Sequence, residues 1–269
     1  MALRSIVSLG TAGEGLTEAI GSAADAVLLT LASDARPVGS LRNTAIEALQ
    51  RISEAEKRGI VVVNHPRTQL LRDDLDAVVS HNLKAVFLAH ALEPQDVRDI
   101  AVLLREFELA RDMEPGDVAV FPVIDSARGL LRAAELVQAA PRVGGLVFAS
   151  AAYARDIGAR AEEKGPRLAY ARGAVVATAR AFDVLPIVIA EPIDLLELAN
   201  YGFAGVVLPD HRSVNGANVA FSPTQAEIER AKRHTTLYDA ARGEGAWVAR
   251  SGDEVVDVHA FRKARQVLE

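Results

Sequence analysis

Short runs of hydrophobic residues alternate along most of the chain with longer segments whose hydrophobic positions follow the helical period. Such runs are typical of strands buried on both faces of a parallel sheet, with a helix crossing over between consecutive strands. The pattern predicts eight strands, at Ser5–Leu9, Ala26–Leu31, Gly59–Asn64, Ala85–Leu88, Val118–Val123, Gly145–Ala149, Pro186–Ile189 and Gly205–Pro209. It predicts helices between them, at Gly15–Ser22, Leu41–Arg58, Leu70–His81, Gln95–Arg111, Ala127–Ala140, Arg167–Ala181 and Asp194–Tyr201.

Eight strands, each followed by a helical segment, predict an α/β fold, a (β/α)8 TIM barrel over residues 1–223. An open doubly wound sheet is the alternative. The glycine-rich segment at residues 10–15 does not support that alternative, because it has neither the lysine of a phosphate-binding loop nor the spacing of a dinucleotide-binding loop. We therefore interpret this segment as an ordinary loop.

The alternation of strands and helices stops after Pro223. Residues 224–269 instead predict a polar helix at Thr224–Ala241, a hairpin of Ala246–Arg250 and Glu254–Val258, and a final helix at Ala260–Leu268. We expect this C-terminal helix–hairpin–helix extension to pack on the barrel or on a neighbouring subunit.

Composition and charge exclude several classes of function. The chain of 269 residues has no cysteine, which excludes disulfides, cysteine-ligated metals and a thiol nucleophile. Its formal net charge of -6 argues against a nucleic-acid partner, because binding to a phosphate backbone needs clustered basic charge. No apolar run approaches about 20 residues and the first residues do not resemble a signal peptide, so we expect a cytoplasmic protein with no membrane partner.

In a (β/α)8 barrel the chemistry lies at the carboxyl ends of the strands, where the following loops meet. Those ends carry side chains suited to metal binding or to general acid–base chemistry: Thr30, Ser33, Asn64, His65, His90, Asp125, Ser126, Ser150, Glu191, Asp210 and His211. A structural role stays open for each, since Asp125 also fits a helix cap, Glu191 a helix start, and Asp210 a solvated turn.

Several segments, taken in order, resemble the motifs of one family. They are Leu3–Ser5 with Gly10 (similar to RSxLxxPG), Ala24–Leu29 (leading into DLED), Val61–Asn64 (VRVN), Ile124–Gly129 (IETARG), Gly202–Gly205 (GFxGK), Asn218–Pro223 (NxxFxP), and Gly243–Ala246 with Gly252 and Asp257 (a closing hairpin). By this order and spacing the chain resembles the citrate lyase β-subunit-like (CitE-like) branch of the HpcH/HpaI aldolase superfamily. The resemblance covers nearly the whole chain.

The resemblance implies cleavage or formation of a carbon–carbon bond beside a carboxylate or thioester. It also implies Mg²⁺, which in that family polarises the carbonyl oxygen and stabilises the enolate. The family's two metal carboxylates come from IETARG and from a later GAED segment. In this chain Asp125 stands at the first position, whereas the acids of the second fall on Ala151 and Ala152, so the second carboxylate is missing.

Other charged positions of the family are also replaced. The acids of DLED fall within Thr30–Ser33, the arginine of VRVN falls on Val62, and a lysine of the family falls on His90. The lysine and histidine of GKxxIHP fall on Val206 and Asp210. Loss of the arginine removes a charge-assisted contact to a substrate carboxylate, so we expect the family's usual substrates to bind poorly.

Two functions follow as alternatives. The first is a divergent, catalytically impaired member that acts as a partner subunit, regulator or ligand-binding barrel, because a single carboxylate binds Mg²⁺ weakly. The second is an active carbon–carbon lyase or aldolase on an acyl-CoA or 2-oxo acid, with a metal site rebuilt around Asp125. In that case Asp125 and Glu191 would hold the metal, and Asp125, His90, Asp210 and His211 would carry proton transfer.

Further candidates concern binding and assembly. Asn64 and Ser150 are expected to contact a substrate, and Arg4, Arg67 and Arg155 are candidates for contacts to coenzyme A phosphates. The resemblance also implies a homo-oligomer, a trimer or hexamer, in which the C-terminal tail crosses to a neighbour.

Overall fold

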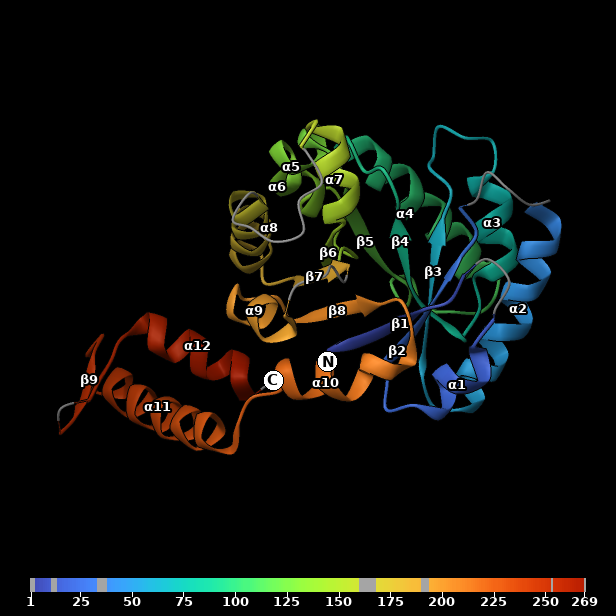
Figure 1. The fold of residues 1–269 in the computed structure, drawn as a ribbon. Coiled ribbons are helices and arrows are strands. Elements are labelled where there is room, and N and C mark those ends of the chain that lie inside the picture. Colours follow the sequence, from blue (N-terminus) through green and yellow to red (C-terminus); the bar gives the residue numbers. More distant parts are fainter. Residues whose placement is uncertain are drawn as a thin grey trace. The chain divides into compact units, whose positions relative to one another are not determined.

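The computed structural model describes residues 3–10, 14–32, 38–159, 168–189, 194–252 and 254–268. These residues fall into two compact units, one of Leu3–Phe221 and one that begins at Ser222 (Figure 1). The first unit is a closed barrel of eight parallel strands in the order β1 to β8, which confirms the predicted (β/α)8 TIM barrel. The strands are β1 (Ser5–Ser8), β2 (Ala26–Thr30), β3 (Arg58–Val63), β4 (Leu83–Leu88), β5 (Ala119–Ile124), β6 (Gly145–Phe148), β7 (Leu185–Ile189) and β8 (Gly205–Leu208).

Helices follow each strand of the barrel, and at least one lies between every two consecutive strands. They are α1 (Leu16–Gly21), α2 (Val38–Glu54), α3 (Leu71–Val78), α4 (Pro94–Leu109), α5 (Ala127–Leu131), α6 (Ala133–Val137), α7 (Ser150–Asp156), α8 (Ala169–Ala181), α9 (Leu195–Asn200), the 3₁₀ turn η2 (His211–Ser213) and α10 (Val214–Ala220). Two differences from the sequence prediction stand out. The single helix expected at Ala127–Ala140 is divided into α5 and α6 at Arg132, and α7 and α10 were not predicted.

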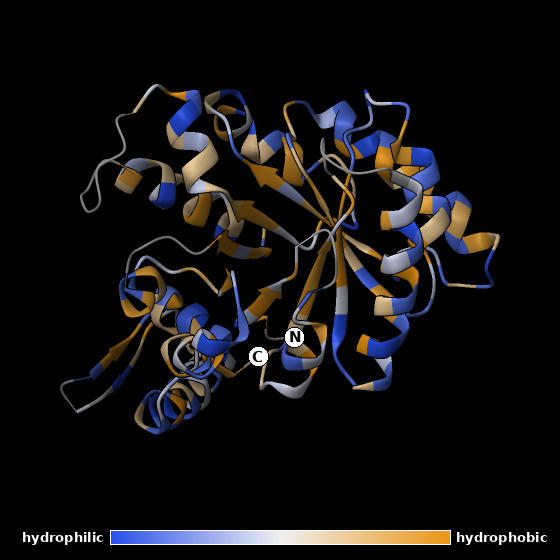
Figure 2. Ribbon diagram, turned by 45° about the vertical axis from the view of Figure 1, so that its right-hand side comes forward, coloured by the Kyte–Doolittle hydropathy of each residue, from blue (hydrophilic) through white to orange (hydrophobic). Residues whose placement is uncertain are grey.

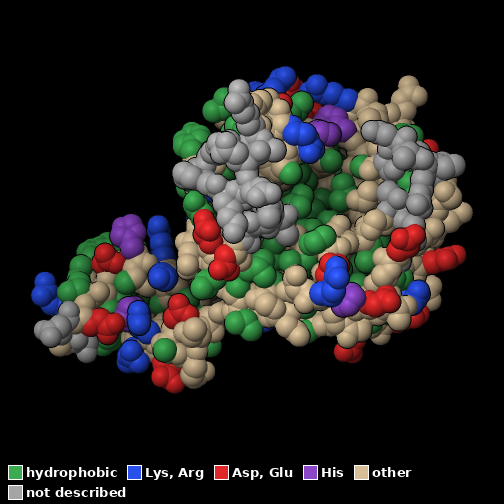
Figure 3. Space-filling model, in the orientation of Figure 1, with side chains coloured by type: hydrophobic (Ala, Val, Ile, Leu, Met, Phe, Trp, Pro, Cys, Tyr) green, Lys and Arg blue, Asp and Glu red, His purple; other side chains and the backbone are tan. Residues whose placement is uncertain are grey.

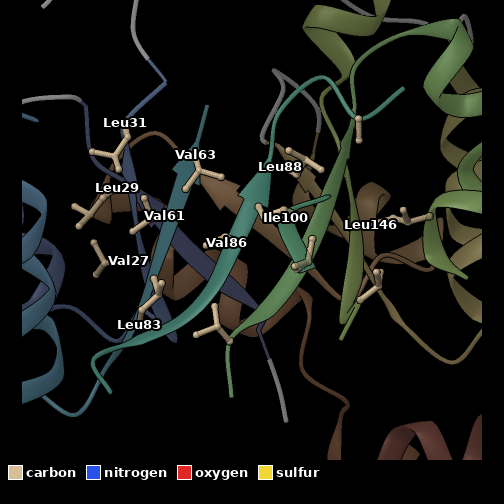
Figure 4. Close-up of a cluster of buried hydrophobic side chains, with 14 of the residues drawn as sticks. Val27, Leu29, Leu31, Val61, Val63, Leu83, Val86, Leu88, Ile100 and Leu146 are labelled. Carbon is tan, nitrogen blue, oxygen red and sulfur yellow. The ribbon is translucent and has the colours of Figure 1, made fainter. Parts of the chain in front are cut away.

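Side chains of the strands pack in two separate layers because successive residues of a strand point to opposite faces. One layer fills the inside of the barrel and includes Ile6, Leu28 and Phe87. The other lies between the strands and the helices, where Val86 and Leu88 of β4 pack near Ile100 of α4 (Figure 4). Both faces of each strand are therefore buried, which explains the short, continuous hydrophobic runs in the sequence (Figure 2).

The barrel closes where β1 pairs with β8, in the register Ile6↔Val207. A Cβ atom at Gly205 would lie 1.7 Å from the backbone oxygen of Leu3, so only glycine allows the two chains to approach this closely. Near the same ends of the strands, the guanidinium of Arg4 binds both carboxylate oxygens of Asp25, with distances of 3.1 Å and 2.7 Å. These contacts belong to the amino ends of β1 and β2, opposite to the mouth of the barrel.

The second unit consists of α11 (Gln225–Gly243), the antiparallel strands β9 (Ala249–Ser251) and β10 (Glu254–Val256), and α12 (Val258–Leu268). Helix α11 begins with a capping box in which Thr224 and Glu227 bind each other's backbone amides. The rings of Tyr238 and Phe261 stack with their centroids 4.5 Å apart and form a small core with Ala249 and Val256. This order of elements agrees with the predicted helix, hairpin and helix.

No helix in the described part of the chain is both long enough and apolar enough to cross a membrane.

Candidate functional site

The residues that follow β5 form the centre of the candidate site. Asp125 is 7% exposed and comes directly after the last residue of the strand. Ser126 caps α5, because its side chain accepts a hydrogen bond of 3.1 Å from the backbone amide of Gly129. A Cβ atom at Gly129 would lie 2.8 Å from the backbone oxygen of Ala91. Glycine at this position therefore lets the first turn of α5 approach the loop that follows β4.

That close approach brings His90 and Asp125 together. The backbone amide of His90 donates to Asp125 Oδ2 at 3.1 Å, and the imidazole Nδ1 lies 2.8 Å from the same oxygen. His90 adopts a left-handed backbone conformation, with φ of 53°, which is uncommon for a residue other than glycine. This conformation directs the backbone amide and Nδ1 of His90 at the same carboxylate. The side chain of His90 is 74% exposed, so Nε2 is open to a ligand at the mouth.

The second carboxylate oxygen of Asp125 has no such partner. Oδ1 is buried and makes no hydrogen bond within the described part of the chain, and the same is true of Oγ of Ser150, the first residue of α7. The two residues follow adjacent strands, since Ile124 of β5 pairs with Phe148 of β6. Buried polar atoms without partners are rare in folded proteins and are commonly completed by water, an ion or a ligand. We take these two oxygens as the polar centre of the candidate site.

Burial raises the pKa of the Asp125 carboxyl above its usual range, although His90 and its backbone amide favour the charged form. Because the folded-state pKa is raised, this carboxyl favours the folded state below its ordinary pKa, and that stabilisation is lost as the pH rises through the folded-state value.

We therefore expect Asp125→Asn to raise the melting temperature at pH 7.5 relative to the unmodified chain, and the gain to shrink toward pH 4. Differential scanning fluorimetry across this pH range measures both. Equal melting temperatures of the two proteins at pH 7.5 would show that the buried carboxylate of Asp125 does not destabilise the folded state.

An ionic network lies at the adjacent rim, after β3 and β4. The imidazole Nε2 of His65 lies 3.3 Å from Asp96 Oδ2 without hydrogen-bonding geometry. Arg67 lies 3.1 Å from Glu93 Oε2, and Arg128 of α5 pairs with the other oxygen of Glu93. Arg67 and Arg128 are each more than half exposed, so their guanidinium groups can also reach an anionic part of a ligand.

Sequence reasoning missed the acidic half of this network. Glu93 and Asp96 form a capping box at the start of α4, where Asp96 accepts hydrogen bonds from the backbone amides of Leu92 and Glu93. The sequence Glu93-Pro94-Gln95-Asp96 carries that signal, because proline favours the first turn of a helix and an acid three residues after the cap can complete a capping box.

The other predicted site residues are placed apart from this centre. The side-chain amide of Asn64 donates to Asp74 Oδ2 at 2.6 Å, and Asp74 in turn pairs with Arg42, so Asn64 is part of a buried polar network. Asp210 caps the turn η2 by accepting from the backbone and side chain of Arg212, and these contacts hold the pKa of its carboxyl below the usual range.

Five predicted positions need separate mention. His211 is exposed in η2, after β8, and Arg4 lies at the amino end of β1, at the end of the barrel away from the mouth. Glu191 and Ser33 lie outside the described residues. Arg155 is exposed on α7.

The described residues do not form a magnesium cage. Among them no group of three or more His, Asp or Glu side chains lies close enough to hold a metal ion. Asp125 offers one uncommitted carboxylate oxygen, Ser150 offers a hydroxyl, and Ala152 stands half-buried in the first turns of α7. Mg²⁺ prefers six oxygen ligands and is usually held through one or two carboxylates with water completing the set, so the single carboxylate oxygen offered here favours weak binding.

Figure 3 shows a hollow lined mainly by hydrophobic side chains on the barrel unit, with arginine and histidine side chains at its rim. A closed parallel barrel with a buried carboxylate, an imidazole and hydroxyl groups at the carboxyl ends of its strands defines a class. It is a (β/α)8 barrel, a class of protein in which ligand sites lie at the carboxyl ends of the strands.

The family is shown by sequence. The pattern of the HpcH/HpaI aldolase/citrate lyase family matches residues 8–208, and the chain belongs to this family. It is 29% identical over 256 residues to the citrate lyase subunit beta of Escherichia coli strain K12, covering 91% of this chain and 85% of that protein. It is 25% identical over a 280-residue alignment to a (3S)-malyl-CoA thioesterase of Cereibacter sphaeroides strain ATH 2.4.9, covering 98% of this chain and 93% of that protein.

Solved structures show the same fold. A citrate lyase from Burkholderia xenovorans LB400 superposes with a TM-score of 0.76 at 17% identity, covering 98% of this chain and 90% of that one. CitE from Mycobacterium tuberculosis, solved in complex with magnesium, acetoacetate and coenzyme A, superposes with a TM-score of 0.71 at 19% identity, covering 99% and 97%.

Proposed function

We propose that this protein binds a CoA thioester or a small oxo acid at the mouth of the barrel and lacks the magnesium-dependent lyase chemistry of its family. The observation that carries this proposal is the donor set around Asp125, where no group of three or more His, Asp or Glu side chains among the described residues lies close enough to hold a metal ion. The neighbouring carboxylate of Asp156 accepts a hydrogen bond of 2.7 Å from the backbone amide of Ala127. Support for the ligand class comes from the family and from the relatives named for malyl-CoA and for a complex with coenzyme A.

The side chains at the mouth are suited to recognising an oxygen-rich ligand. Ser150 Oγ can donate a hydrogen bond to a carbonyl oxygen, and the exposed imidazole of His90 can accept or donate one. Arg67 and Arg128 stand at the rim where an anionic group would enter. In the family, magnesium supplies the positive charge that stabilises an enolate. No described residue supplies a comparable charge beside Asp125, since the nearest partner is an imidazole.

A second candidate function rests on one contact. The 2.8 Å distance between His90 Nδ1 and Asp125 Oδ2 is that of a carboxylate-oriented histidine, in which Nδ1–H donates to the carboxylate and Nε2 is left as a proton acceptor. Such a pair can take a proton from a hydroxyl or a carbon acid without a metal. The candidate is therefore a lyase or aldolase that uses the His90–Asp125 pair as general base.

Restoring the missing acid tests the proposal. We expect the unmodified chain to show no saturable heat with Mg²⁺ by isothermal titration calorimetry, and Ala152→Asp to bind Mg²⁺, because the new carboxylate would stand beside Asp125 at the mouth. Ala154→Asp serves as control. It adds the same charge at a half-buried position on the same helix, but Ala154 does not correspond to either acid of the family's GAED segment.

The same proteins are then assayed for cleavage of malyl-CoA and citryl-CoA and for melting-temperature shifts with coenzyme A, its thioesters and oxo acids. A stabilising ligand without turnover supports the proposal. Magnesium-dependent cleavage by the unmodified chain at ordinary enzyme rates overturns it. Turnover without magnesium that is lost in Asp125→Ala and His90→Ala establishes the second candidate instead. Assembly as a trimer or hexamer stays a prediction of the family resemblance, which light scattering of the same samples measures.

A further inference from the structure

We propose that the mouth of this barrel selects a ligand whose acyl end is uncharged and aliphatic, and that Val62 is a specificity-determining residue. The inference rests on the proposed function, because it concerns the acyl end of the same CoA thioester. It goes further by stating which acyl groups fit and which are rejected.

The argument begins with the side chains that point inward at the carboxyl end of each strand. Ile6, Leu28, Ile60, Phe87, Phe121, Val147, Ile187 and Val207 belong to the layer inside the barrel. Alternation along the strands fixes the last inward residue of each. For β1 to β8 these residues are Ser8, Thr30, Val62, Phe87, Val123, Val147, Ile189 and Val207.

This inward layer of strand residues, all of which the structure describes, contains two hydroxyls and six hydrocarbon side chains and no charged group. Phe87, Val123, Val147 and Val207 are buried and form its base. Ser8, Thr30 and Val62 are half-buried and Ile189 is 36% exposed, so these four reach the open space above that base. The hollow lined by hydrophobic side chains in Figure 3 lies on the barrel unit, on the side toward which β3 and β4 point in Figure 1.

An anionic acyl end is poorly suited to this layer. A carboxylate placed against Val62 and Ile189 would lose water without gaining a cationic partner from any strand, which is costly. It would also approach the buried carboxylate of Asp125, which lies one residue beyond β5. A methyl group in the same place gains contact with the valine and isoleucine side chains. Ser8 and Thr30 remain available for one carbonyl or hydroxyl oxygen.

Two thioesters of equal chain length separate these cases. Butyryl-CoA and succinyl-CoA both carry four acyl carbons, but the first ends in a methyl group and the second in a carboxylate. We expect isothermal titration calorimetry of the full chain at pH 7.5 to give a Kd for butyryl-CoA that is at least about tenfold lower than the Kd for succinyl-CoA. Free coenzyme A is the reference for the part of the ligand that they share.

Val62→Arg is expected to shift the ratio of the two Kd values toward succinyl-CoA by about tenfold or more, because a guanidinium can pair with the terminal carboxylate. Ile189→Arg provides a second variant on β7, at a more exposed position, should arginine at residue 62 prevent folding. Val255→Arg, at a position 49% exposed on β10, adds the same charge in the other unit and should leave the ratio unchanged.

The outcomes are distinct. Equal affinity of the unmodified chain for both thioesters, or tighter binding of succinyl-CoA, overturns the inference and leaves the proposed function intact. Failure of coenzyme A and both thioesters to bind overturns the inference, and it overturns the proposed function as well when no oxo acid binds. If Val62→Arg and Ile189→Arg both fold and neither changes the ratio of the Kd values for butyryl-CoA and succinyl-CoA, this layer of side chains does not determine specificity.

Discussion

Replacing Gly205 by alanine is expected to prevent normal closure of the barrel. The added Cβ atom would lie 1.7 Å from the backbone oxygen of Leu3 and 2.7 Å from its carbonyl carbon, so the backbone itself must move. Overpacking of this kind costs about 3 kcal/mol or more when no flexible side chain can give way. For a chain of this size that corresponds to a melting temperature lower by about 6–12 °C. Urea unfolding followed by circular dichroism gives the change in free energy.

Gly173→Ala is the matched control. Gly173 lies inside α8, and a Cβ atom there meets no other atom within 4 Å. Alanine in a helix interior is favoured over glycine by about 0.5–1 kcal/mol, so this variant should be slightly more stable than the unmodified chain. Equal stability of the two variants would contradict the importance of the close approach between Gly205 and Leu3.

Loss of the carboxylate of Glu108 is the second large effect. Glu108 is fully buried on α4 and accepts hydrogen bonds of 2.9 Å and 2.8 Å from Arg142, together with backbone amides of Gly116 and Val118. We expect Glu108→Gln to lower the free energy of unfolding by about 3–5 kcal/mol, because it leaves the guanidinium of Arg142 buried without a counter-charge. Glu106→Gln, on the same helix, breaks only an exposed pair with Arg72 and should cost less than about 1 kcal/mol.

The effect of Glu108 should depend on pH in a defined direction. Burial alone would raise the pKa of this carboxyl, but the hydrogen bonds from Arg142 and the two backbone amides hold it below its usual range. A lowered pKa means that the stabilisation is fully present above the ordinary value for glutamate and is lost as the pH falls through the folded-state pKa. The difference between Glu108→Gln and the unmodified chain is therefore expected to be constant from pH 6 to 8 and to shrink on acidification. A difference that grows toward low pH would contradict this assignment.

The barrel could be predicted from sequence because each of its strands is buried on both faces. The resulting hydrophobic runs, separated by helical periods, mark all eight strands to within a few residues. The short helices were harder. Helix α7 has seven residues and begins at Ser150 without a side-chain cap, and the break between α5 and α6 at Arg132 has no glycine or proline to signal it.

The site could be predicted only in part. Asp125 and His90 were each found from their positions after strands, but not as a pair, because their contact depends on the left-handed backbone of His90 and on the close approach allowed by Gly129. Both are tertiary features with no local pattern. Likewise, the hydrogen bond from Asn64 to Asp74 connects residues that are ten positions apart, one after β3 and the other in the first turn of α3.

The pairing of β1 with β8 also has a consequence for how the chain folds. About two hundred residues separate Ile6 from Val207 in that register. During synthesis β1 therefore keeps one edge without a neighbour until nearly the whole barrel has emerged, and an open strand edge is a template for pairing with another chain. Dilute refolding, or a chaperone that shields the nascent chain, protects this edge during the interval.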